Sequence, residues 1–348
     1  MKPIHFLGIL TLITGYFTYK VFYPFLETIV IAVLLSIATY KINFYFLEKF
    51  KNKTFSATLS TILIAILFFA PIVYLITTAA TTIAHMDIDN IKDIYHNIYN
   101  WINEFISKNE YLKNTNITEY LEKIDLNAAV NKLVNIASFL AAKSAKFLKD
   151  IVLILIFYFF ANMYGKDVLL YFQKIMPLSK YESTKIFESL ANVMGVVFSS
   201  ILATAFFEGV LFGIIAQIYG YDGLMFGILY GFASLIPVIG GILMWLPLSI
   251  HQFAIGNTSA AIIIAIYSIV IISIIADTFI KPIIIKYIDT ILIKKEVFIN
   301  ELLVFFAIVA GLASYGFWGM IIGPAVLTLF ISIINIYPEI SKSENNKC

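Results

Sequence analysis

Arginine is absent from the chain, and cysteine occurs once, as the last residue, Cys348. Without arginine there is no guanidinium fork that could hold a phosphate or carboxylate through two parallel hydrogen bonds. A lone cysteine excludes an internal disulfide and a thiolate metal site. The zinc-protease pattern HExxH, the phosphate-binding loop GxxxxGK[ST] and the dinucleotide loop GxGxxG are also missing. We therefore expect a protein that is not an enzyme and that holds no metal and no cofactor.

Charged residues are also scarce in the chain. Charged residues make up 13% of the 348 positions and hydrophobic residues 60%, whereas soluble domains have about 25% and about 45–50%. The net charge of +2 is too small to indicate nucleic-acid binding. Four long runs hold only one charged residue, Glu188, between them: 55–83, 186–207, 223–276 and 302–337. This composition predicts an integral membrane protein, in contact with the lipid bilayer along most of its length.

The apolar residues are grouped into stretches that suit membrane helices. A helix crosses a bilayer core of about 30 Å with about 20 residues. Lys2 precedes the first stretch as in a signal peptide, but no small-x-small cleavage site follows, so we interpret this stretch as a retained membrane helix. Eight stretches approach the required length: 4–23, 25–40, 55–83, 150–172, 192–219, 223–255, 259–280 and 300–337.

Lysine clusters indicate the direction of the spans, because short cytoplasmic loops are enriched in lysine. Clusters lie at 41–53, 166–185 and 281–295, and further lysines occur at both ends of the chain. All of them reach the cytoplasmic side if 223–255 and 300–337 are re-entrant hairpins and the six other stretches cross. The sequence thus predicts a bacterial inner-membrane protein with both termini in the cytoplasm.

Glycine and proline interrupt both predicted hairpins. The first reads YGYDGLMFGILYG at 219–231 and SLIPVIGG at 234–241, and the second reads GLASYGFWGMIIGP at 311–324. Such breaks leave backbone groups unpaired, so they are found where protein or a water-lined cavity satisfies them. Paired broken segments indicate a transporter binding site. Close helix packing at small residues is the alternative interpretation.

The segment 85–149 has a different character. It is polar, carries charges of both signs and repeats apolar residues at helical spacing, as at Ile91, Ile94 and Ile98. It is too polar to cross the membrane. We expect amphipathic helices on the periplasmic side, with the apolar stripe facing lipid, the rest of the protein or a neighbouring subunit.

The predicted fold is therefore all-α and polytopic, with about six crossing helices, two re-entrant helical hairpins and an amphipathic helical insert. Residues 1–84 are expected to be N-terminal membrane helices that act as a scaffold, and residues 85–149 form the insert. Residues 150–337 are expected to form a transport-type membrane domain with hairpins near 223–255 and 300–337, followed by a cytoplasmic tail at 338–348.

Three motifs resemble the autoinducer-2 exporter (AI-2E) family of bacterial membrane transporters: GFASLIPVIGG at 231–241, DTFIKP at 277–282 and AGLASYGFWGMIIGP at 310–324. Their order and spacing are similar to those of the family, as is the position of the polar insert. The resemblance implies a homo-oligomer, a pentamer, in which each subunit transports through two hairpins. It implies as substrate the quorum-sensing signal autoinducer-2 or, in some members, Na⁺ or Li⁺ exchanged for H⁺. The chain differs from many members in Glu208 and in lacking a proline at the start of the second hairpin.

Glu208 is the first candidate for a functional side chain. It lies deep in the stretch 192–219, and a charged group at membrane depth costs on the order of 3 kcal/mol on insertion scales, so it is expected to face the bundle interior. Such an acid suits a proton-coupled site. The alternative is a protonated glutamate that hydrogen-bonds to a neighbouring helix.

Asp277 and Lys281 are the second candidates. They are four residues apart and are expected to share one helix face just before Pro282. The pair indicates a cation or substrate site. The alternative is an ion pair within one helix, with Lys281 reaching towards water.

The remaining candidates lie in or near the hairpins. Asp222 is either a ligand or a helix cap, and Ser234, Ser314 and Asn300 offer polar contacts to a solute or satisfy broken backbone. His251 is expected to be an interfacial residue without a function. The residues expected to shape the hairpin backbone are Pro237, Gly240, Gly241, Gly311, Gly316, Gly319, Gly323 and Pro324.

These features predict a secondary transporter of a small polar solute, which works by alternating access as the hairpins move against the earlier helices. A Na⁺(Li⁺)/H⁺ antiporter is the alternative within transport. A non-transporting membrane scaffold and a channel are the alternatives from other classes.

Overall fold

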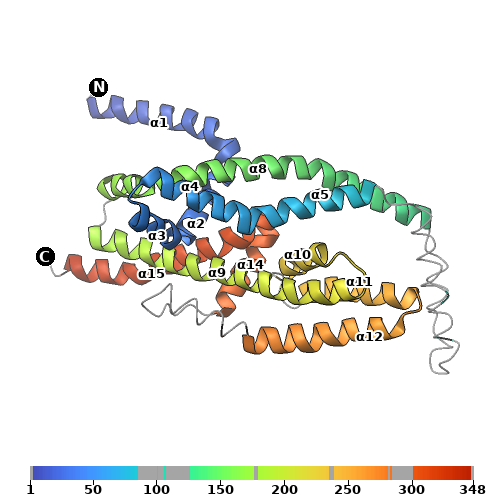
Figure 1. Cartoon of the computed structure of the whole chain (residues 1–348). Coiled ribbons are helices and arrows are strands. Elements are labelled where there is room, and N and C mark those ends of the chain that lie inside the picture. The colour runs from blue at the N-terminus through green and yellow to red at the C-terminus, as the bar shows by residue number, and fades with distance from the viewer. Residues whose placement is uncertain are drawn as a thin grey trace. The chain divides into compact units, whose positions relative to one another are not determined.

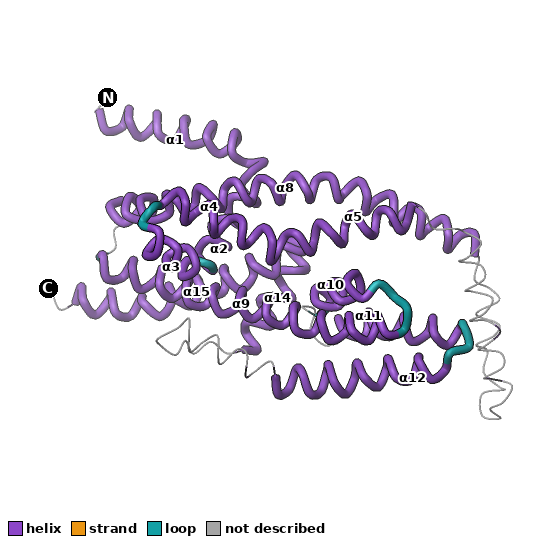
Figure 2. The backbone as a smooth tube through the Cα atoms, viewed as in Figure 1, coloured by secondary structure: helices purple, strands orange, loops and turns teal. Residues whose placement is uncertain are grey.

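The computed structural model describes residues 3–84, 126–175, 179–234, 239–280 and 301–345, with three further single positions. Throughout these ranges the chain forms helices joined by turns, and no strand occurs among them (Figure 1 and Figure 2). Helices suit the apolar sequence because they satisfy every backbone group within the segment, with no need for water. The predicted all-α class is confirmed.

Five helical stretches of the described residues are long and apolar enough to cross a membrane: Pro3–Ala38, Lys53–Thr78, Lys180–Ile218, Thr258–Ile280 and Leu302–Asn335. The polytopic membrane class is therefore confirmed. The count differs from the predicted one in part because 4–23 and 25–40 join into one helical run through a 3-10 turn, Tyr23–Phe25. Proline does not separate them, because Pro24 stands at the start of that turn, where a backbone donor is not needed.

The described residues fall into two compact units. The first unit draws on Met1–Leu63, Lys149–Gly195 and Val297–Cys348, and the second on Ile64–Leu148 and Val196–Glu296. Three helices contribute to both units: α4 (Lys53–Ile64), α8 (Leu126–Ile175) and α9 (Lys180–Ile218). The predicted division into a scaffold at 1–84 and a transport domain at 150–337 stays a prediction.

Uncharged polar side chains join the helices of the first unit. The hydroxyls of Thr39 and Tyr158 lie 2.7 Å apart, and the Asn43 amide donates to the Asn162 carbonyl over 3.3 Å. Hydrogen bonds of this kind stabilise helix pairs in lipid, where burial of apolar surface gives no advantage. The helices of this unit are α1 (Pro3–Phe22), α2 (Leu26–Ala38), α3 (Tyr40–Phe50), most of α4 (Lys53–Ile64), the later part of α8 (Leu126–Ile175), the first part of α9 (Lys180–Ile218), α14 (Glu301–Tyr315) and α15 (Gly319–Asn345).

An aromatic pair lies at the centre of the second unit. Phe212 stacks on Tyr230 with ring centroids 4.4 Å apart, and both side chains are buried. Leu248, Ile264 and Ile272 pack into the same cluster. The elements of this unit include α5 (Ala70–Ala84), the rest of α9, α10 (Gly223–Ala233), α11 (Ile239–Ala254), α12 (Thr258–Tyr267) and the π-helical segment η3 (Ser268–Ile280).

Helical hairpins occur at both predicted places. α10 packs against α11 in the second unit, and α14 packs against α15 in the first (Figure 1). Between α14 and α15 the chain reverses through a 3-10 turn, Gly316–Trp318. Gly316 has φ +59° there, a backbone conformation that favours glycine. Re-entry of the hairpins into the membrane stays a prediction.

Two predicted boundaries fall inside helices. α8 runs unbroken from Leu126 to Ile175, so the end of the insert and the apolar stretch after it form one helix. α15 continues to Asn345, beyond residue 338, where the tail was expected to begin. Polarity gives a helix no reason to stop, because lysine and glutamate are good helix formers. The insert residues 85–99, 101–105 and 107–125 lie outside the described residues.

Candidate functional site

The backbone of α10 lies directly against that of α9. A Cβ atom added to Gly209 would lie 2.6 Å from the Gly227 carbonyl oxygen, and one added to Gly227 would lie 2.7 Å from the Gly209 carbonyl oxygen. Gly213 and Gly223 face each other in the same way, at 2.6 and 2.5 Å. Real Cβ atoms essentially never approach other atoms within 3.0 Å. No larger residue therefore fits at these four positions unless a helix moves.

A four-residue repeat of glycine on both helices causes this close approach. Residues at i and i+4 share one face, and small residues at this spacing let membrane helices come together. Gly231 extends the row by one turn and lies against the Ala205 carbonyl group. Sequence reasoning selected hairpin glycines by their density and missed this row. The spacing of Gly209 to Gly213 and of Gly223 to Gly227 is the signal that identifies it.

The α14–α15 hairpin also brings two helix backbones into contact at small residues. Gly311 lies against Gly319, and Gly323 lies against Ala307, in each case backbone to backbone. Pro324 follows the crossing and is buried. The structure thus shows close packing at the predicted hairpin glycines, and a role for them in transport stays a prediction.

The tip of the first hairpin is equally tight. Gly240 lies against the backbone of Ala233, and a Cβ atom on Gly241 would lie 2.8 Å from the Tyr230 hydroxyl oxygen. The tip therefore leaves no room for a side chain at either glycine. Pro237 lies outside the described residues.

Glu208 is buried on α9, with 3% of its surface exposed. Thr204 and Phe212, one turn before and after it, are buried as well, so this face of α9 points into protein. One turn further back, the Ser200 hydroxyl is buried without a hydrogen-bond partner in the described part of the chain. Ser200, Thr204 and Glu208 form a polar row on one helix face. Sequence reasoning identified only the acid, although the four-residue spacing extends to the two hydroxyls.

The burial of Glu208 limits its chemistry. An ionised carboxylate away from water is costly unless a cation or several hydrogen bonds compensate it. Glu208 interacts with another group of the protein, so its burial is compensated in part. Buried acids in membrane spans are among the groups that carry protons, so Glu208 stays a candidate coupling group.

Asp277 belongs to η3, which is π-helical over Ser268–Ile280. π-Helical turns within α-helices are frequently found at functional sites. The segment begins at Ser268, whose hydroxyl is fully buried and has no hydrogen-bond partner within the described ranges. The side chain of Asp277 and the whole of Lys281 and Asn300 lie outside the described residues, so their predicted pairing and contacts stay predictions.

The other candidates satisfy backbone or face outward. Asp222 caps α10 by accepting a hydrogen bond from the Met225 amide over 2.9 Å, and its second oxygen accepts from the Tyr74 hydroxyl over 3.3 Å. Ser234 donates to the Gly231 carbonyl over 3.0 Å at the end of α10. Ser314 on α14 is exposed. For Asp222 and Ser234 the structure therefore shows the backbone role that the sequence left open beside the ligand role.

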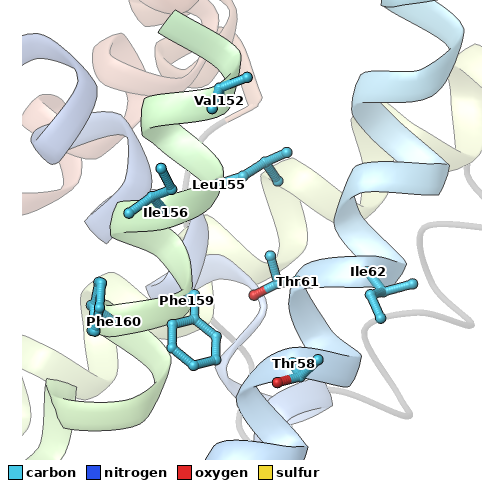
Figure 3. A pocket seen from close by; sticks show the side chains of 8 residues that line it. All are labelled: Thr58, Thr61, Ile62, Val152, Leu155, Ile156, Phe159 and Phe160. Atoms are coloured by element: carbon cyan, nitrogen blue, oxygen red, sulfur yellow. The ribbon is translucent and has the colours of Figure 1, made fainter. Parts of the chain in front are cut away.

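A groove of about 470 Å³ lies between α4 and α8 (Figure 3). Thr58 and Thr61 on α4 and Leu155 and Phe159 on α8 are among the side chains that line it. The lining is almost entirely apolar, and none of the predicted site residues belongs to it. This is a surface that suits lipid and not a polar solute. Among the described residues, no group of three His, Cys, Asp or Glu side chains could hold a metal.

Comparison with known proteins places the chain among transporters. A family model described as "AI-2E family transporter" matches residues 6–339. A protein of Helicobacter pylori (strain ATCC 700392 / 26695) named "Putative transport protein" is 33% identical over 337 residues, which is 97% of this chain and 96% of that protein. A protein of Aquifex aeolicus with the same name is 21% identical over 89% of both chains. A third, from Treponema pallidum, is 26% identical over 168 residues, 46% of this chain and 38% of that protein.

Proposed function

The chain belongs to the AI-2E family of transporters, and from this premise we propose that it is a secondary transporter that exports a small polar solute similar to autoinducer-2. The observation that carries the proposal is the buried row of Ser200, Thr204 and Glu208 on α9. Polar groups inside a membrane bundle are costly, and they mark the paths of solutes and protons. The same helix bears the glycine row against which α10 packs.

Alternating access is the mechanism that we propose. α10 packs against α9 and α14 packs against α15 through glycine rows, backbone to backbone, and these crossings are where we propose that the helices shift. Glu208 would carry the coupled proton, with Asp277 as a second polar group on the path. Lys281, Asn300 and Ser314 would contact the solute, while Asp222 and Ser234 hold the ends of α10.

We further propose a homo-oligomer, a pentamer as the family resemblance implies, in the bacterial inner membrane. The polar insert that leads into α8 would then lie on the periplasmic side, against a neighbouring subunit or the lipid surface. Export of a signal from the cytoplasm would connect the protein with quorum sensing.

A Na⁺(Li⁺)/H⁺ antiporter is the second candidate, and the burial of the acid Glu208 favours it.

A neutral solute can be distinguished from a cation with purified protein in liposomes. We expect labelled autoinducer-2 to accumulate in vesicles preloaded with the unlabelled compound, at equal pH on both sides and only when the protein is present. A pH-sensitive dye that responds to added Na⁺ or Li⁺, without autoinducer-2 exchange, would support the antiporter instead. If neither signal is observed, the non-transporting membrane scaffold is the remaining candidate.

The proposed topology predicts a labelling pattern for single cysteines, introduced after replacement of Cys348. Cysteines at Asn52, Tyr181 and Ile293 are expected to resist an impermeant thiol reagent added outside the cell, because their loops are predicted to be cytoplasmic. Asn52 and Tyr181 are exposed, so burial would not explain their protection.

Ser259→Cys is the matched control, since Ser259 is also exposed and lies in the first turn of α12, on the predicted outer side. It is expected to react with the impermeant reagent. Reaction at Ile293 alone among the three protected sites would mean that the first hairpin crosses the membrane completely, and the re-entrant arrangement would be wrong.

A further inference from the structure

A polar cluster joins the turn between α9 and α10 to the end of α11. The Tyr221 hydroxyl lies 2.6 Å from Nδ1 of His251, and the two rings are 5.6 Å apart between centroids. The Gln252 side-chain amide donates to the Tyr221 hydroxyl over 3.1 Å and to the Tyr219 carbonyl over 3.3 Å. Tyr221 also packs edge-on against Phe226 of α10. One tyrosine therefore connects the turn, α10 and α11.

The orientation of the Gln252 amide follows from its neighbours. The Tyr219 carbonyl accepts hydrogen bonds and cannot donate, so the Gln252 nitrogen must face it. The Gln252 oxygen is then left buried without a hydrogen-bond partner in the described part of the chain, and 3% of the residue is exposed. Reversing the amide would place oxygen against oxygen.

The donor directions at Tyr221 follow in turn. Its oxygen accepts from Gln252, so its own proton points either to His251 Nδ1 at 2.6 Å or to the Leu248 carbonyl at 3.5 Å. The 2.6 Å contact is a hydrogen bond in either ring tautomer, and 3.5 Å is at the limit for one, so we assign the tyrosine proton to His251 Nδ1. His251 therefore accepts at Nδ1 and carries its proton on Nε2, which is the neutral form of the ring.

Adding a proton to His251 reverses this bond. Protonated Nδ1 becomes a donor, and the Tyr221 oxygen must then accept from both His251 and Gln252. Among the described residues, the other acceptor in contact with the tyrosine hydroxyl is the Leu248 carbonyl, 3.5 Å away. Burial raises the pKa of Tyr221, so the phenol stays protonated and needs such an acceptor. A small shift of the turn towards α11 would shorten this contact.

We propose that Tyr221, His251 and Gln252 form a second proton-binding site, separate from Glu208, whose protonation redirects the Tyr221 hydroxyl to Leu248 and changes how the α9–α10 turn is held on α11. Histidine changes charge between about pH 5 and pH 8, the range in which a membrane pH gradient acts. The arrangement in the structure requires the neutral ring and is lost when the ring takes up a proton. The site lies where the first hairpin begins, so its proton affects the hairpin directly.

Few other ionisable groups face this site in the described residues. Tyr219 and Asp222 flank Tyr221 in the turn, and Tyr74 of α5 binds Asp222. Tyr267 of α12 donates to the Leu211 carbonyl, away from the cluster. As residue types, tyrosine and aspartate change charge outside the range from pH 5 to 8. A pH effect on the turn in this range would therefore come from His251.

The test is hydrogen exchange of the turn in the full-length protein, reconstituted in lipid nanodiscs. After correction for the intrinsic pH dependence of exchange, amide protection over 219–226 is expected to fall about five-fold between pH 8 and pH 5.5, the factor for one net hydrogen bond. His251→Gln is expected to abolish this step. His5→Gln is the matched control, because His5 is exposed on α1, and it is expected to leave the step unchanged.

Nitrogen NMR on histidine-labelled protein supplies the second measurement, and it does not depend on transport. At pH 8 the His251 signal, identified by its loss in His251→Gln, is expected to show the Nε2–H tautomer, and Tyr221→Phe is expected to shift its Nδ1 resonance. A Nδ1–H tautomer at pH 8 would overturn the proposal. So would a step in protection that is the same in His251→Gln as in the parent.

Discussion

Replacing Gly227 by alanine is expected to destabilise the protein by about 1–3 kcal/mol, the usual cost of forcing extra atoms into a packed interior. The added Cβ atom would lie 2.7 Å from the carbonyl oxygen of Gly209. That oxygen is backbone, so no side-chain rotation can relieve the overlap. α9 and α10 must separate along their whole crossing. Thermal unfolding in detergent, followed by loss of the monodisperse peak on gel filtration, measures the effect.

Gly165→Ala is the matched control. Gly165 lies inside α8, and nothing lies within 4 Å of the Cβ atom that alanine would add there. Alanine forms helices more readily than glycine by about 1 kcal/mol, so this variant is expected to be as stable as the parent or slightly more stable. Equal stability of Gly227→Ala and Gly165→Ala would show that the close crossing of α9 and α10 does not exist in the purified protein.

Replacing Glu208 by glutamine is expected to abolish transport driven by a pH gradient while leaving solute exchange at equal pH intact. Glutamine has nearly the same shape and costs less to bury than a carboxylate, so the variant should insert and bind solute. It cannot take up or release a proton. The two assays on the same proteoliposome preparation therefore separate proton coupling from binding.

Glu188→Gln controls for the loss of an acid on the same helix. Glu188 is exposed on α9, five turns before Glu208 and away from its polar row. This variant is expected to retain both activities. If Glu208→Gln transports as well as the parent over the whole pH range, Glu208 is only a buried hydrogen-bonding group, and its proposed coupling role fails.

The fold class was predictable because membrane helices leave a strong compositional signal. Runs such as 55–83 and 302–337 carry no charge, and helices follow from the need to satisfy backbone groups in lipid. The places where the chain reverses direction within each hairpin were predictable from the density of glycine and proline, as at Gly316. The helix ends were less predictable, because polar residues after 337 continue α15 and those before 150 belong to α8.

The site was predictable only where a residue type is rare. Glu208 is conspicuous as an acid in an apolar run, and the structure buries it. Ser200 and Thr204 carry no such signal, since hydroxyls are common on membrane helices. The π-helical form of 268–280 has no sequence marker, because it arises from how η3 packs. His251 was interpreted as an interfacial residue because its partner, Tyr221, is 30 residues away in sequence.

Coupled transport is the central claim, and one proteoliposome measurement tests it most directly. Vesicles containing the purified protein are given a pH gradient, and accumulation of labelled autoinducer-2 is followed with and without a protonophore. We expect accumulation above the equilibrium level that depends on the protein and disappears when the protonophore dissipates the gradient. Movement of the solute only to equilibrium, at a rate that the pH gradient does not change, would contradict secondary transport and would identify a channel.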